Sequence, residues 1–146
     1  MPVDTVRDIL ARKGRDIVAV PPGATVLEAA QLMNTRGTGS VLVLEGKKPV
    51  GIFTERDVLR RVVAEQRNPV TTPVRDVMTT SLISCQPDTP LEQCAAVMTE
   101  RRIRHLPVVG PEGLCGVVTS GDVLAFQFAE QEATLKHLSS YFYDVR

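Results

Sequence analysis

Apolar and polar positions alternate along the chain in the same order twice. Short apolar runs at residues 17–20 and 82–85 each predict a β-strand, and a proline follows each run. A helix start comes next, marked by Thr25 in the first series and by Thr89 with Pro90 in the second. In both, a glutamate three residues after the threonine is typical of a capping box. The helices place their apolar residues three or four positions apart, the spacing of a core-facing side: Leu27, Ala30 and Met33, then Leu91, Ala95 and Met98.

A β-hairpin is predicted after each of these helices. The first spans residues 40–54 with its turn at 45–48, and the second spans residues 105–119 with its turn at 110–113. β-Branched residues in the runs and glycine in the turns are typical of such hairpins. A second helix closes each series, and in the first its apolar residues are Val58, Leu59, Val62 and Val63.

The two series are copies of each other. The motif Gly-x-x-Thr-x-x-Asp at residues 51–57 returns at residues 116–122, 65 positions later, and the same offset relates Met33 to Met98. Such a match without a gap predicts a tandem duplication. The predicted segments are residues 1–66 (first repeat with an N-terminal segment), 67–73 (linker), 74–128 (second repeat) and 129–146 (C-terminal helical extension).

A repeat of about sixty residues buries too little surface to be stable alone. We therefore expect an α+β fold in which two β-α-β-β-α repeats pack about a pseudo-two-fold axis, with a C-terminal helical extension. An apolar stripe continues past the second repeat and predicts that the extension is buried against its own module or a partner. The stripe consists of Leu124, Phe128, Leu135, Leu138 and Phe142.

Composition excludes several classes of protein. Lysine plus arginine and aspartate plus glutamate both number 17, so the chain lacks the basic excess of a dedicated nucleic-acid binder. Uncharged stretches stay well below the roughly 20 residues of a spanning helix, which predicts no membrane segment. The odd set of three cysteines favours a reducing compartment, and we expect a cytoplasmic protein. Catalytic and metal-binding motifs are missing, so we expect no enzyme activity, no catalytic cofactor and no metal.

The repeated motif at the start of each closing helix allows two interpretations. In the first, Thr54 and Thr119 cap the helices, and Asp57 and Asp122 favour the helix dipole. In the second, the helix N-terminus attracts a phosphate while the carboxylate accepts both hydroxyls of a ribose. The recurrence of the motif in register favours a ribonucleotide site.

These motifs, together with the run at residues 102–108, resemble a tandem pair of CBS (cystathionine β-synthase) domains, called a Bateman module. The resemblance extends over roughly residues 6–128. It implies two adenosine-ligand clefts between the repeats, in which the motif aspartate holds the ribose and the motif threonine lies near the phosphate. It also implies that the opposite repeat lines the adenine slot, so that Ile17 and Val18 face Asp122 with Thr119, and Thr80 and Ile83 face Asp57 with Thr54.

The two copies differ where the clefts are expected. Gly39 and Ser40 in the first copy correspond to Arg104 and His105 in the second, whose side chains could neutralise a phosphate or form a solvated helix end. We interpret Arg101 and Arg102 as such a solvated end.

The residue before the motif aspartate also differs: it is Arg56 in the first copy and Gly121 in the second. One basic and one open cleft suggest two occupants. We expect a mononucleotide, AMP or ATP, in one cleft and a second adenine nucleotide, with NAD(H) as the candidate, in the other.

Because the repeats take up nearly the whole chain, we expect a stand-alone regulatory module that senses adenine nucleotides. Its conformational change would be transmitted to an unknown effector protein. Modules of this family commonly pair, so we also expect a homodimer. The alternative is a structural dimerisation scaffold without ligand.

Overall fold

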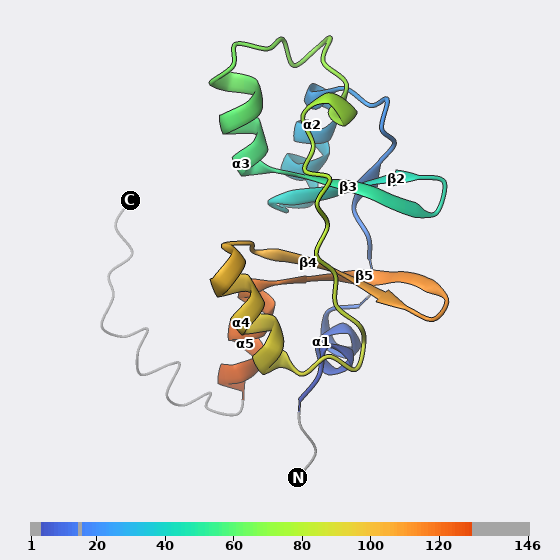
Figure 1. Cartoon of the computed structure of the whole chain (residues 1–146), viewed down its shortest axis with the longest axis vertical. Helices are drawn as coiled ribbons and strands as arrows, with labels where there is room; N and C mark the ends of the chain where they lie inside the picture. The colour runs from blue at the N-terminus through green and yellow to red at the C-terminus, as the bar shows by residue number, and fades with distance from the viewer. Residues whose placement is uncertain (1–3, 15, 130–146) are drawn as a thin grey trace, which may run out of the picture.

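The computed structural model describes residues 4–14 and 16–129, and it contains two similar halves stacked on each other (Figure 1). The first half has a three-stranded sheet in the order β1-β2-β3, with β1 parallel to β2 and β2 antiparallel to β3. The second half has the antiparallel pair β4-β5. The strands are β1 (Ala19–Val20), β2 (Ser40–Glu45), β3 (Lys48–Thr54), β4 (His105–Gly110) and β5 (Gly113–Thr119).

The helices of each half cover the outer face of its sheet, so the two sheets lie next to each other in the middle, where β3 contacts β5 (Figure 1). The α+β fold of two repeats is therefore confirmed. The α-helices are α1 (Val6–Lys13), α2 (Val26–Arg36), α3 (Glu55–Asp57), α4 (Leu91–Arg101) and α5 (Ser120–Ala129). A wide π-helical segment, η1 (Val58–Val63), continues α3, and a short 3-10 turn, η2 (Val74–Asp76), follows the linker.

Both hairpins lie where the sequence predicts them, but the strands before the two long helices are shorter than predicted. The run at residues 17–20 contributes only β1, and the run at 82–85 contributes a single bridge between Cys85 and Val108. Leu82 donates its N–H to the carbonyl of Thr80 instead of joining the sheet. This turn explains why the second sheet has two strands.

The starts of the long helices are capped in different ways. Thr25 accepts a hydrogen bond from the Glu28 N–H at 3.1 Å, as the capping box predicts. The predicted box at Thr89 is wrong, because the N-cap residue of α4 is Pro90, which has no side-chain acceptor. Thr89 instead accepts from the Gln86 N–H at 2.9 Å.

The segments that precede the two repeats are exchanged between them. Val6, Ile9 and Leu10 of α1 are buried in the core of the second repeat, and Val74 and Val77 after the linker are buried in the core of the first. Each repeat thus completes the core of the other, which holds the halves together and brings residues from one repeat to the motif of the other.

No helix within the described parts of the chain is long and apolar enough to cross a membrane. The C-terminal extension predicted at residues 129–146 lies outside the described residues beyond Ala129, and with it the stripe residues Leu135, Leu138 and Phe142.

Candidate functional site: a basic cleft between the repeats

A cavity of about 630 Å³ lies between the two repeats, where the motif of the first faces the α4–β4 loop of the second. We call it the interface cleft. The first repeat and the segment after the linker contribute Gly39, Ile52, Thr54, Glu55, Arg56, Asp57, Arg60, Arg61 and Thr79. The second repeat contributes Arg101, Arg102, Ile103, Arg104, His105, Thr119 and Ser120. Its volume is within the range of roughly 300–1,000 Å³ that is usual for small-molecule sites.

Asp57 is the buried acid of the interface cleft, with only 6% of its surface exposed. Its Oδ2 accepts hydrogen bonds from the Thr54 N–H at 3.0 Å and the Thr54 hydroxyl at 3.2 Å. The Asp57 N–H in turn donates to the Thr54 hydroxyl oxygen, which completes a capping box. The Nε of Arg61 lies 3.6 Å from Oδ1. These contacts fix the carboxylate at the edge of the cavity.

Thr79 comes from the exchanged segment and faces Asp57. Its hydroxyl donates to Oδ1 at 3.2 Å. Backbone hydrogen bonds in both directions between Ile52 and Thr79, each 2.9 Å, hold this segment against β3. The approach is so close that a Cβ at Gly51 would lie 3.0 Å from the Thr79 carbonyl and would overlap the sulfur of Met78. Because Gly51 has no side chain, the Thr79 hydroxyl can reach the Asp57 carboxylate, in addition to the hydroxyl of Thr54.

Arginines line the interface cleft from both repeats. Arg61 donates to the carbonyl of Met78 at 2.9 Å, and Arg56 reaches across to the carbonyl of Arg102 at 3.5 Å. Arg102 itself ends α4 in the left-handed conformation, with φ of 56°. Arg101 and Arg102 are both exposed at the end of α4, as the sequence predicts, and they also line the interface cleft.

His105 begins β4 and lines the interface cleft. Burial lowers the pKa of His105 below its ordinary value, and Lys13 and Arg104 act in the same direction. Glu55 and Asp122 oppose this shift. At neutral pH His105 is therefore an uncharged donor and acceptor.

The motif of the second repeat has a different environment. Asp122 accepts a hydrogen bond from the Thr119 N–H at 2.9 Å, like its counterpart, but its Oδ2 also lies 2.7 Å from the Nζ of Lys13. Lys13 further donates to the carbonyl of Val117 at 3.0 Å. A separate cavity of about 260 Å³, lined by Ile9, Arg12, Lys13, Asp122, Ala125 and Phe126, adjoins this pair.

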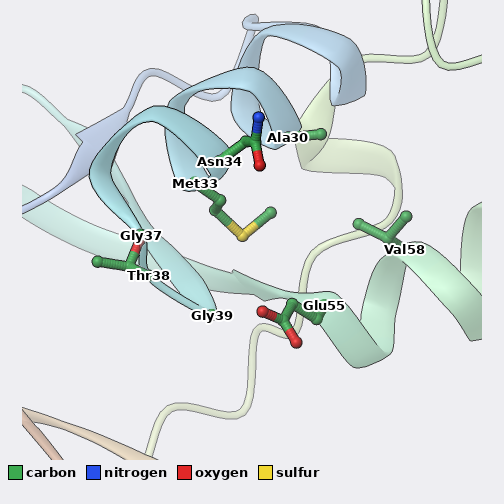
Figure 2. A pocket seen from close by; sticks show the side chains of 8 residues that line it. All are labelled: Ala30, Met33, Asn34, Gly37, Thr38, Gly39, Glu55 and Val58. Atoms are coloured by element: carbon green, nitrogen blue, oxygen red, sulfur yellow. The ribbon is translucent and has the colours of Figure 1, made fainter. Parts of the chain in front are cut away.

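A third cavity of about 410 Å³ lies between the end of α2 and the start of α3 (Figure 2). Met33 projects toward it from α2, and Glu55 lies below Met33 in this view, at the start of α3. Gly39 and Glu55 line both this cavity and the interface cleft. Since Glu55 is the one charged residue of its lining, this cavity is poorly suited to a phosphate.

The structure brings half of the predicted site residues together in the interface cleft: Gly39, Thr54, Arg56, Asp57, Arg104, His105 and Thr119. The other half do not line it: Ile17, Val18, Ser40, Thr80, Ile83, Gly121 and Asp122.

The positions outside the cleft are either packed elsewhere or exposed. Ile83 packs against the core of the second repeat and Val18 against that of the first. Ser40 is buried and pairs with Thr54 in the sheet. Gly121 and Thr80 are exposed.

Sequence reasoning missed Thr79, which is one position before the predicted Thr80. It also missed Arg60 and Arg61, although residues three and four positions after Asp57 lie on the same side of a helix. That spacing could have found them.

The fold and the cleft together define a class: a tandem-repeat module with a ligand-sized cavity between its halves. The model of the CBS domain family matches residues 5–64 and 74–129. The chain belongs to the CBS domain family, as the resemblance predicts.

Curated relatives support this assignment. The chain is 34% identical over 131 residues to the CBS domain-containing protein YhcV of Bacillus subtilis, and the match covers 90% of this chain and 91% of YhcV. It is 32% identical over 146 residues to the mitochondrial CBS domain-containing protein CBSX3 of Arabidopsis thaliana, covering 94% and 71%.

Solved structures share the fold. A protein with CBS domains from Burkholderia ambifaria MC40-6 superposes with a TM-score of 0.85 at 38% identity, covering 88% of this chain and 96% of that one. The CBS domain protein PAE2072 of Pyrobaculum aerophilum, solved in complex with AMP, superposes with a TM-score of 0.72 at 27% identity, covering 82% and 89%.

Proposed function

We propose that this protein is a regulatory module that binds one adenine nucleotide in the interface cleft and transmits the bound state to a partner protein. The observation that carries the proposal is the buried Asp57 carboxylate at the edge of an arginine-lined cavity between the repeats. A carboxylate is an acceptor that suits a ribose diol, and guanidinium groups suit phosphate. The AMP complex of PAE2072 supports a ligand of this class.

In the proposed complex the ribose hydroxyls replace Thr79 as hydrogen-bond donors to Asp57. Ile52 and Ile103 provide apolar surface for the base, and the arginines hold the phosphate. Because the ligand contacts both repeats, its binding favours one relative arrangement of the two halves. An effector protein would recognise this change in the relative arrangement of the two halves.

The second nucleotide cleft expected from the repeated motif, with NAD(H) as the candidate for one of the two clefts, is not part of this proposal. Lys13 already neutralises Asp122, so this carboxylate is a poorer acceptor for a ribose than Asp57.

We also propose that the closing helices pair two copies of the chain. Leu59 and Leu124 occupy matching positions of the two repeats and are 63% and 55% exposed, and Val63 is 62% exposed. Burial of such side chains against a second copy is favourable.

Native mass spectrometry of the freshly purified protein tests both parts. We expect the mass of a dimer with one adenine nucleotide per chain, and identification of the small molecule after denaturation. Asp57→Asn keeps the helix cap but removes the charge, and we expect it to lose the nucleotide. Asp122→Asn is the matched control, because it changes the same motif position outside the cleft. Equal loss in both variants would contradict the assignment to Asp57, and a strictly monomeric mass would contradict the pairing.

A further inference from the structure

The interface cleft has an unusual balance of charge. Six guanidinium groups and two carboxylates line it, which leaves an excess of four positive charges in a chain whose formal net charge is zero. The neutral His105 adds none at physiological pH. Like charges around one cavity repel each other, and because the six arginines are exposed, salt screens this repulsion. An anion that enters the cavity relieves it by pairing with the guanidinium groups.

The positive charges come from two sides of the cavity. Arg56, Arg60 and Arg61 belong to the closing helix of the first repeat. The others belong to the second repeat, at the end of α4 (Arg101) and in the loop to β4 (Arg102 and Arg104). The hydrogen bond from Arg56 to the Arg102 carbonyl joins the two groups. An anion in the interface cleft would thus contact guanidinium groups of both repeats.

Most of these guanidinium groups lack an acidic partner. Arg61 faces Asp57. For the other five, Arg56, Arg60, Arg101, Arg102 and Arg104, no ion pair with a carboxylate exists among residues 4–14 and 16–129. Five guanidinium charges are therefore available to a ligand.

We infer that the natural ligand carries a chain of two or more phosphates, as in a nucleoside di- or triphosphate, and that AMP binds more weakly. One phosphate monoester carries roughly two negative charges and would neutralise only part of the excess. Each additional phosphate adds acceptor oxygens for guanidinium groups that stay unpaired with AMP. This inference rests on the proposed nucleotide site and specifies the ligand class for it.

Isothermal titration calorimetry without magnesium tests the inference with adenosine, AMP, ADP, ATP and inorganic tripolyphosphate. We expect affinity to increase about tenfold or more with each phosphate from AMP to ATP, because each gains charge-assisted hydrogen bonds. The preference for ATP should decrease with increasing salt concentration.

Substitutions test which arginines produce the preference for ATP over AMP. The double variant Arg101→Gln/Arg104→Gln should reduce the ratio of ATP to AMP affinity toward one, while the exposed Arg67→Gln, outside the cleft, should leave it unchanged. Thermal melting of each variant checks that it is folded.

The outcomes separate this inference from the proposed function. Equal affinity for AMP and ATP overturns the inference and leaves the nucleotide site intact. Tripolyphosphate binding as tightly as ATP, with no adenosine contribution, overturns the nucleotide site and leaves a polyanion site. A double variant with wild-type selectivity shows that these arginines do not hold the phosphates.

Discussion

Replacing Lys13 with methionine tests whether the second repeat binds nucleotide more weakly than the first because Lys13 neutralises the Asp122 carboxylate. Lys13 ends α1 and reaches the second motif, where its Nζ lies 2.7 Å from Asp122. A ribose that approached Asp122 would have to displace this ammonium group. Methionine keeps an unbranched apolar stem of similar length but removes the charge.

The cost to stability should be small. The two side chains are 35% and 24% exposed, so solvent screens much of their attraction, and such pairs contribute up to about 1 kcal/mol. The buried Val6, Ile9 and Leu10 still anchor α1 in the core of the second repeat. We therefore expect Lys13→Met to fold and to lose about 1 kcal/mol of unfolding free energy in urea.

The effect on binding should be of similar size. A ribose at the second motif must break an ion pair that contributes up to about 1 kcal/mol, so its removal should improve nucleotide affinity there by up to about fivefold. Calorimetry with ATP should then show a second, weaker equivalent per chain. Lys13→Arg, which keeps the positive charge, should still bind one equivalent. A single equivalent in Lys13→Met, with affinity unchanged, would refute the reasoning.

Two further perturbations concern the packing and the titration of the interface cleft. Gly51→Ala should destabilise the fold by about 1–3 kcal/mol, because the added methyl group overlaps Met78 and lies close to the Thr79 carbonyl. Urea unfolding measures the loss, and an unchanged unfolding midpoint would contradict the close approach of this segment to β3. The pKa of His105 is lower in the folded than in the unfolded chain, so its stabilising contribution is present above about pH 6.5 and decreases as pH falls through the lower folded value. His105→Gln should remove this part of the pH dependence, measured by melting between acidic and neutral pH, and an unchanged pH dependence would contradict the role of His105.

The sequence predicts the parts of the fold that depend on local patterns. Both hairpins follow from alternation and turn glycines, and α2 begins at its predicted cap, Thr25. The cap of α4 could not be predicted in the same way. The first N–H of this helix, that of Leu91, donates to the carbonyl of Asp4 at the other end of the chain, so no local acceptor is needed.

In the site, too, the sequence predicts residues of a local motif but not those brought there by contacts between distant segments. Thr54 and Asp57 were found because their motif is contiguous. Thr79 was missed because it reaches Asp57 from 22 positions away through a bridge to β3. For Arg101 and Arg102, the helix dipole gave a sufficient local explanation, and their approach to the first repeat depends on how the two halves stack.

A small difference between the leading segments explains why two copies of one motif are not equivalent. The apolar residues of these segments match at an offset of 68, whereas the motifs match at 65, so the first copy has three extra residues before its first strand. Because the leading segments are exchanged, each delivers a side chain to the other repeat's carboxylate. Asp57 receives the neutral hydroxyl of Thr79 and Asp122 receives the ammonium group of Lys13. A ligand hydroxyl can replace the first at little electrostatic cost, while replacing the second separates an ion pair. The duplication thus retained both motifs but gave their carboxylates different partners through the segments that precede the repeats, and we expect the two to differ in affinity for a ribose.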